Sequence, residues 1–125
     1  MKIRKRLSAD GLLRHMRQGM AKIEDHRPMN AVIPLVDALM SGLALFALKD
    51  PSLLAFDERR AAPANLQRIF GLEQMPSDTQ MRTILDEVNP ATLRPLYKRV
   101  FSQLQRGKVL EKMTFMGRYY LLSLA

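Results

Sequence analysis

The sequence predicts an all-α fold, and three observations support this prediction. Apolar residues recur at intervals of three and four along most of the chain, which is the period of an amphipathic helix. Pro, Gly, Asn and Asp interrupt these stretches at short intervals, as expected for helices joined by short connections. The 125 residues are 47% hydrophobic and 26% charged, which is typical of one globular domain and excludes disorder for most of the chain.

The first predicted helix spans residues 9–24, where Leu13, Met16 and Met20 share one apolar face. The second spans residues 34–48, because Pro34 suits a first helical turn and the Asp50–Pro51 pair cannot continue a helix.

Three further helices follow. Ser52 is a candidate cap for a short helix, and a second short helix from Pro63 stops at Gly71, the residue type favoured at helix ends. Ser77 and Gln80 have the spacing of a capping box, which predicts a helix over 77–88. A longer amphipathic helix is expected over 93–104, with Pro95 in its first turn.

The last segment of the chain differs in composition from the helical stretches before it. Residues 114–124 are rich in aromatic and apolar side chains, which favours a buried β-strand. No partner strand is expected in an otherwise helical chain, so the segment resembles the beginning of a larger fold.

The net charge of +8 is unevenly distributed. Residues 1–27, 28–88 and 89–125 contribute +5, −3 and +6. Two basic ends favour a partner that carries repeated negative charge, and they favour nucleic acid over an anionic membrane surface. The alternative is that these charges only solvate the surface.

Membrane insertion is not expected. Residues 29–48 are the most apolar stretch, but Asp37 near its centre would cost about 3 kcal/mol in a bilayer. Because the chain has no cysteine, disulfides, thiolate metal sites and a cysteine nucleophile are excluded. A cytoplasmic protein without a membrane partner is therefore predicted.

The short helix ending at Gly71 and the helix after Ser77 have an order typical of a helix-turn-helix, whose second helix reads bases in the major groove. The connector is longer than usual, so a packed helix with a solvated polar face is the alternative. The basic N-terminal arm suits phosphate contacts. The candidate DNA-binding residues are Lys2, Arg4, Lys5, Arg6, Arg59, Arg60, Thr79, Gln80, Arg82 and Thr83.

No metal or cofactor site is predicted. His15 and His26 lack metal-ligand spacing, and the adjacent carboxylates Asp57–Glu58 and Asp86–Glu87 diverge on a helix rather than converging on one atom.

Four segments resemble the N-terminal region of bacterial insertion-sequence transposases of the DDE type. They are DALMSGLALFALKDPSLLAFDERR (37–60), NLQRIFGLEQMPSDTQMRTILDEVNPATLRPLY (65–97), LQRGKVLEKM (104–113) and YYLLSL (119–124). The resemblance implies a helical DNA-binding domain over 1–113 and the first strand of a truncated RNase H-like catalytic domain over 114–125.

In that family the first catalytic aspartate follows this strand in the pattern L-L-S-L-D-G-T, whereas Ala125 stands here. The resemblance thus implies a chain that binds element DNA in duplex form but is not itself an enzyme. A divalent metal, Mg²⁺ or Mn²⁺, is expected only for a full-length relative. The alternative is a helical module for protein interaction or dimerisation, which would pack against the missing catalytic domain or a second copy.

Overall fold

The fold is predominantly helical, as predicted. The computed structural model describes residues 7–29, 31–59 and 64–120. Candidate residues Lys2, Arg4, Lys5, Arg6 and Arg60, and also Ala125, lie outside these ranges. The elements are α2 (Ala9–Met20), α3 (Leu35–Ala47), α4 (Leu53–Arg59), α5 (Ala64–Phe70), α6 (Asp78–Leu85), η1 (Pro90–Thr92), α7 (Arg94–Arg106), η2 (Leu110–Met113), β1 (Thr114–Phe115) and β2 (Tyr119–Tyr120).

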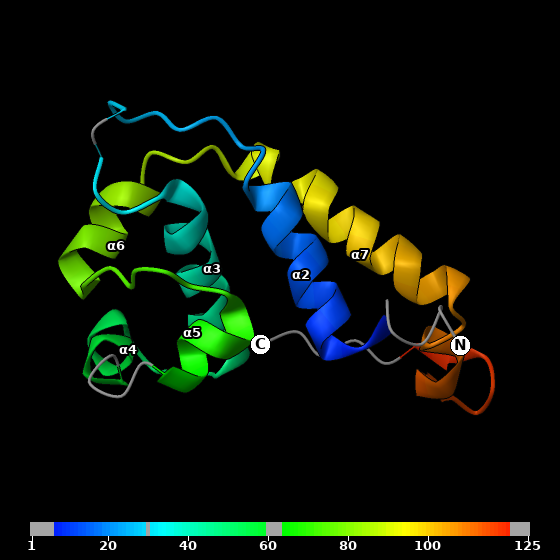
Figure 1. Cartoon of the computed structure of the whole chain (residues 1–125). Helices are drawn as coiled ribbons and strands as arrows, with labels where there is room; N and C mark the ends of the chain where they lie inside the picture. Colours follow the sequence, from blue (N-terminus) through cyan, green and yellow to red (C-terminus); the bar gives the residue numbers. More distant parts are fainter. Residues whose placement is uncertain (1–6, 30, 60–63, 121–125) are drawn as a thin grey trace.

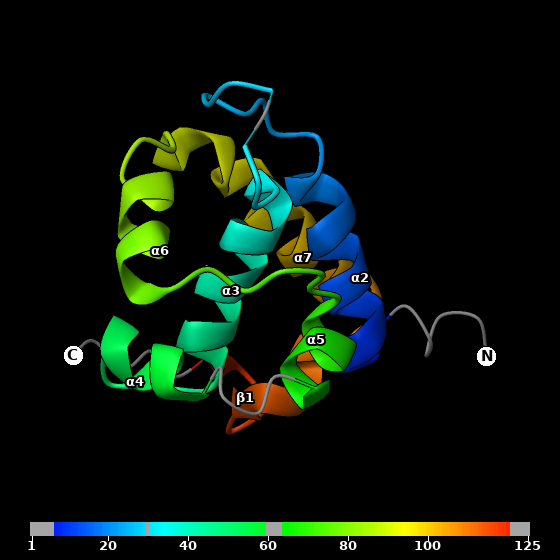
Figure 2. The ribbon, with the colours of Figure 1, turned by 60° about the vertical axis from the view of Figure 1, so that its left-hand side comes forward.

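Helix α3 lies at the centre of the helical body. Figure 2 shows it between α4 and α6 on one side and α2 and α5 on the other. It packs against α2, α5 and α6. Ala38, Met40 and Ala44 have no solvent exposure, because neighbouring helices cover most of the surface of α3. Its apolar character thus reflects a buried helix of a folded domain, as the charge of Asp37 predicted.

Helix α7 packs along α2 (Figure 1). Leu96 of α7 is buried, and Leu93 and Val100 pack against the core from the same side of the helix. Gly19 of α2 lies at the crossing, where a Cβ atom would collide with the side chain of Leu96. A glycine here lets the two helices approach closely.

The local signals for helix ends are confirmed. Ser77 Oγ accepts from the Gln80 N–H at 3.3 Å, and Gln80 Oε1 accepts from the Ser77 N–H at 2.9 Å, which completes the capping box. Ser52 Oγ accepts from the Ala55 N–H at 3.1 Å. Gly71 has a φ of +67°, the left-handed conformation expected after α5. Pro95 lies in the first turn of α7.

The C-terminal segment differs from the single strand that was expected. It reverses direction and forms a short antiparallel hairpin in which Phe115 pairs with Tyr119. Met116 and Gly117 have φ values of +54° and +70°, a pattern that favours tight hairpin turns. The strand prediction missed this turn and also predicted burial, whereas Phe115, Tyr119 and Tyr120 are exposed. Residues 121–124 of the expected strand lie outside the described residues.

The helices on either side of the connector 71–77 have different neighbours. Helix α5 packs against α2 and α3, whereas α6 packs against α3 and α4. The predicted order of short helix, connector and second helix is present. However, α5 and α6 are not close-packed partners, so the arrangement departs from a helix-turn-helix, in which the two helices are joined by a tight turn.

Candidate nucleic-acid interface

Three arginines from two helices line one open groove. Arg14 and Arg17 lie one turn apart on α2, and Arg68 lies in the last turn of α5. The groove has a volume of about 470 Å³. Its other lining residues are Asp10, Leu13, Ile69, Phe70 and Gly71. We call this site the arginine groove.

The local sequence explains why these arginines converge. Ser8 caps α2 by accepting from the Gly11 N–H at 3.1 Å, which fixes where the helix begins. A spacing of three residues then places Arg14 and Arg17 on the same side of α2. At the other wall, Gly71 ends α5 directly after Phe70, so Arg68 lies in the turn that borders α2.

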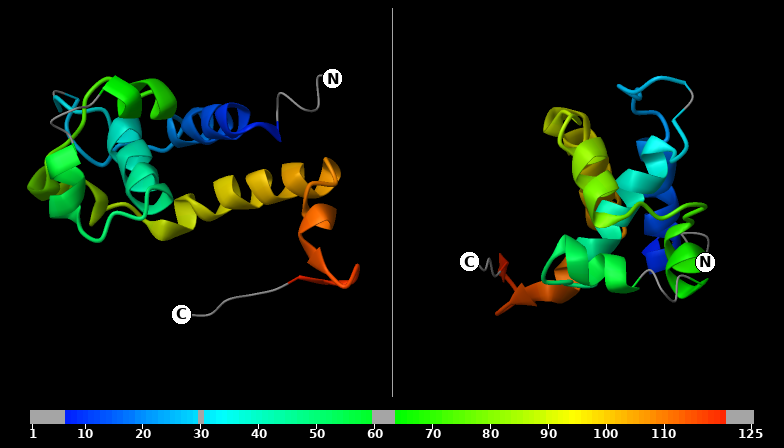
Figure 3. Two further views of the ribbon diagram at one scale, coloured as in Figure 1. Left: turned by 90° about the horizontal axis from the view of Figure 1, so that it is seen from below. Right: turned by 90° about the vertical axis from the view of Figure 1, so that its left-hand side faces the viewer.

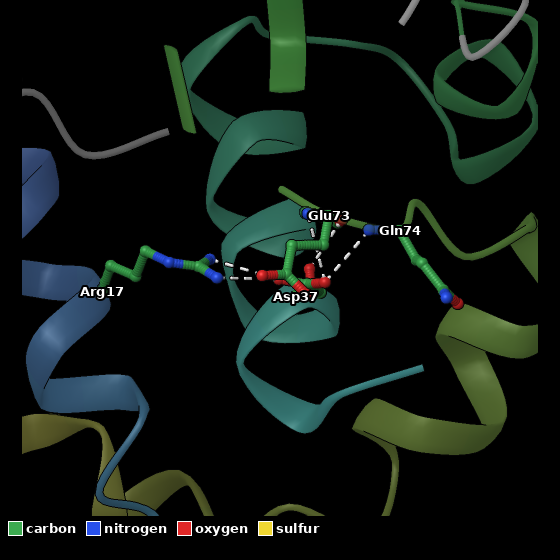
Figure 4. Close-up of polar contacts among 5 residues, drawn as sticks. Arg17, Asp37, Glu73 and Gln74 are labelled. Atoms are coloured by element: carbon green, nitrogen blue, oxygen red, sulfur yellow. Dashed lines mark hydrogen bonds and ion pairs between the residues drawn. The ribbon is translucent and has the colours of Figure 1, made fainter. Parts of the chain in front are cut away.

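A buried carboxylate orients the central arginine of the groove (Figure 4). Asp37 of α3 has no solvent exposure, and one of its oxygens accepts from Arg17 Nη1 and Nη2 at 3.2 and 3.1 Å. Its second oxygen accepts from the backbone N–H groups of Glu73 and Gln74 at 3.3 and 3.1 Å. The Arg17 side chain remains 28% exposed, so the same guanidinium still reaches the groove.

The arginine groove retains positive charge. Asp37 compensates Arg17, but Arg14 and Arg68 form no ion pair with any residue that the structure describes, and both are exposed. Asp10 is the acidic residue among the lining side chains. Planar guanidiniums with free N–H donors at an open groove are suited to phosphate oxygens.

The predicted recognition residues Thr79, Gln80, Arg82 and Thr83 all lie on α6 and are exposed. Three of them are occupied by local bonds, and Thr79 Oγ1 donates to Asp78 Oδ1 at 3.4 Å. Gln80 Oε1 is part of the capping box, and Thr83 Oγ1 donates to the Thr79 carbonyl at 3.0 Å.

The charge around α6 is also unlike that of the arginine groove. Arg82 shares an apolar groove of about 360 Å³ with Asp50 and Asp86, and Asp78 begins the helix. Glu87 follows Asp86 in the sequence, and its Oε2 atom lies 3.3 Å from His26 Nε2. Acidic neighbours repel phosphates, so α6 is less suited than α2 and α5 to the backbone of DNA.

Arg59 is the remaining candidate DNA-binding residue among those that the structure describes, and it is the last residue of α4.

The residues of the arginine groove were each visible in the sequence, but their convergence was not. The spacing of Arg14 and Arg17 predicts a shared helix face. Arg68 lies more than fifty residues further along the chain, and no local pattern indicates that α5 packs beside α2.

Comparisons with known proteins do not identify a relative. No family model matches the chain, and neither a curated protein nor a solved structure gives a significant match. Within the described ranges, no helix is long and apolar enough to cross a membrane. Nor does that part of the chain bring together three or more His, Cys, Asp or Glu side chains that could hold a metal ion.

Proposed function

We propose that this chain is a DNA-binding region of a DDE-type transposase and that it contacts the phosphates of duplex DNA through the arginine groove. The observation that carries the proposal is the convergence of Arg14, Arg17 and Arg68 from two helices on one open groove. The basic arm with Lys2, Arg4, Lys5 and Arg6 directly precedes α2 in the sequence and adds further phosphate contacts. This proposal implies a location in the bacterial cytoplasm.

Duplex DNA fits this charge distribution better than a compact acidic ligand does. A duplex presents phosphates at regular intervals over a long surface, and each contacting cation releases a condensed counterion. The residue blocks of +5 and +6 give the chain many such cations in addition to the groove. Affinity should therefore be in the micromolar range and should fall steeply with salt.

The groove itself is tested by Arg14→Gln combined with Arg68→Gln, because these two side chains support no described ion pair of the fold. Fluorescence anisotropy with a labelled duplex would be measured over about 50 to 200 mM salt, the range in which counterion release dominates. The logarithmic salt slope should decrease by about 0.9 for each lost phosphate contact. Arg82→Gln on α6 is the matched control and should leave the slope unchanged.

The basic arm is tested separately by changing Lys2, Arg4, Lys5 and Arg6 to alanine, which should lower the slope by about one contact for each residue engaged. Absence of duplex binding at about 50 mM salt would contradict the proposed function. Salt-insensitive self-association in place of binding would favour the alternative, a helical dimerisation module.

A further inference from the structure

The C-terminal part of the chain exposes aromatic side chains in a strongly basic setting. Five aromatic residues are each between 51% and 58% exposed: Tyr97 and Phe101 on α7, and Phe115, Tyr119 and Tyr120 on the hairpin. We call Tyr97, Phe101, Phe115 and Tyr119 the aromatic surface, because Tyr120 follows Tyr119 in β2 and therefore points to the other face of the hairpin. The exposed cations of this part of the chain are Arg94, Lys98, Arg99, Arg106, Lys108, Lys112 and Arg118. Glu111 is the one acidic residue in the sequence from 89 to 125.

Helix α7 alternates aromatic and basic residues along one side. Tyr97 and Phe101 are four residues apart and therefore lie one turn apart on the same face. Arg94 and Lys98 each precede one of these aromatics by three residues, which places them on that face as well. The aliphatic side of the helix, with Leu96, is buried in the core.

The hairpin adds a second aromatic group. Phe115 and Tyr119 are directly opposite each other in the antiparallel register, with Arg118 in the turn between them. In the left view of Figure 3, α7 lies between α2 and the hairpin. The hairpin is thus on the opposite side of α7 from α2 and its arginine groove.

We propose that the aromatic surface binds single-stranded DNA, with bases stacked on the aromatic rings and phosphates held by the neighbouring lysines and arginines. Stacking on aromatic side chains needs unpaired bases, whose faces are hidden inside a duplex. Cations interleaved with exposed rings match a strand that presents a phosphate with every base. This inference uses residues outside the arginine groove and goes beyond the proposed binding of duplex DNA.

Charge complementarity favours this occupant over two others. A second copy would bring two surfaces of the same sign together, because residues 89–125 carry +6 in each copy. An anionic membrane attracts the cations, but interfacial helices insert a broad apolar face. Leu93, Leu96 and Val100 pack against the core, which leaves only Tyr97 and Phe101 as exposed large apolar side chains of α7.

Two of the three tyrosines of the chain, Tyr97 and Tyr119, belong to the aromatic surface, the third, Tyr120, is next to Tyr119 in β2, and the chain has no tryptophan. Intrinsic tyrosine emission therefore reports on α7 and the hairpin. Titration with an unlabelled oligo(dT) should quench the emission as bases stack on the rings. A duplex of equal length should quench it far less at the same phosphate concentration.

The decisive variant is Tyr97→Leu combined with Phe101→Leu, measured by anisotropy with labelled oligo(dT). Each lost stack should weaken binding about tenfold, while duplex affinity stays within about twofold. Phe46→Leu on α3 is the matched control, because Phe46 is an exposed aromatic outside this surface, and it should change neither affinity. Far-ultraviolet circular dichroism would verify that the variants fold.

Other outcomes would overturn the inference. These are oligo(dT) binding that is unaffected by the double variant, binding to phosphatidylserine vesicles without binding to oligo(dT), or self-association lost with the same variant. The Arg14→Gln/Arg68→Gln variant separates the two proposals, because it should weaken binding to the duplex and leave tyrosine quenching by oligo(dT) intact.

Discussion

Both terminal nitrogens of Arg17 donate to the same oxygen of Asp37, which leaves the other carboxylate oxygen to accept from the backbone. Asp37 thus joins α2, α3 and the connector 71–77 at one buried point (Figure 4). This arrangement requires a side chain with two oxygens that both accept hydrogen bonds.

Asp37→Asn should therefore lower the free energy of unfolding by about 3 kcal/mol, as expected when a buried ion pair loses one partner. The amide has the same size, but its NH₂ group must face either the guanidinium or the backbone N–H donors. Urea denaturation would measure the loss. Asp86→Asn, an exposed position, is the control and should stay within about 0.5 kcal/mol of wild type. An equal loss of stability in the two variants would mean that the buried contacts of Asp37 do not stabilise the fold.

The capping box gives a second prediction. Ser77→Ala should destabilise the protein by about 1 kcal/mol, because the Gln80 N–H loses its acceptor at the start of α6. Thr79→Ala should cost less, since Thr79 lies one residue inside the helix and its hydroxyl only contacts the adjacent Asp78 at 3.4 Å. The midpoints of chemical denaturation would compare the two variants. A larger loss for Thr79→Ala would contradict the assigned cap.

Gly71 gives a third prediction because it combines a positive φ with a close neighbour. A Cβ atom would strain the backbone at φ +67° and would lie 3.2 Å from Arg17 Cδ. Gly71→Ala should therefore destabilise the protein by about 1 to 2 kcal/mol. Gly117→Ala shares the positive φ but has nothing within 4 Å, so it should cost less. Thermal unfolding followed by circular dichroism would rank the pair, and the reverse order would refute the role of Arg17.

The crossing of α2 and α7 gives a fourth prediction. Alanine normally stabilises a helix relative to glycine by about 0.5 to 1 kcal/mol. Gly19→Ala should instead destabilise this protein by about 1 to 3 kcal/mol, because the new methyl group collides with Leu96. In a double-mutant cycle, Leu96→Ala should remove most of that cost. Additive effects would show that the two positions do not touch.

The fifth prediction concerns catalysis. The resemblance aligns Ala125 with the first metal-binding aspartate of the transposases, and a methyl group offers no ligand oxygen. The 125-residue chain should therefore not nick supercoiled plasmid in the presence of Mg²⁺ or Mn²⁺. Ala125→Asp should not restore cleavage, because one carboxylate cannot hold two metal ions. Metal-dependent nicking that follows the purified chain through chromatography would show that this assignment is wrong.

Local chemistry made the helices predictable from the sequence. The Ser77–Gln80 box, the stop at Gly71 and the position of Pro95 each depend on a few neighbouring residues, and all three are confirmed. The ends of α2 and α6 were predicted three to four residues too late, because the apolar pattern continues after the helical hydrogen bonds end.

Features that depend on tertiary packing were not predictable. The sequence showed Asp37 only as an unsuitable residue for a membrane span, whereas its partners lie 20 to 37 residues away. The arginine groove likewise depends on the packing of α2 beside α5. The hairpin turn was missed for a different reason: Met116 adopts a positive φ that its residue type rarely favours, so Gly117 alone carried the turn signal.

The contact of Asp37 with the connector has a consequence for local stability. Glu73 and Gln74 are exposed residues, yet their amide hydrogens point to a carboxylate that solvent does not reach. These amides can exchange with deuterium only when the connector separates from α3. Leu72 and Met75 of the connector are buried in the core, so this separation also exposes apolar side chains. The connector should therefore open together with the core rather than fray independently, although it contains no regular secondary structure.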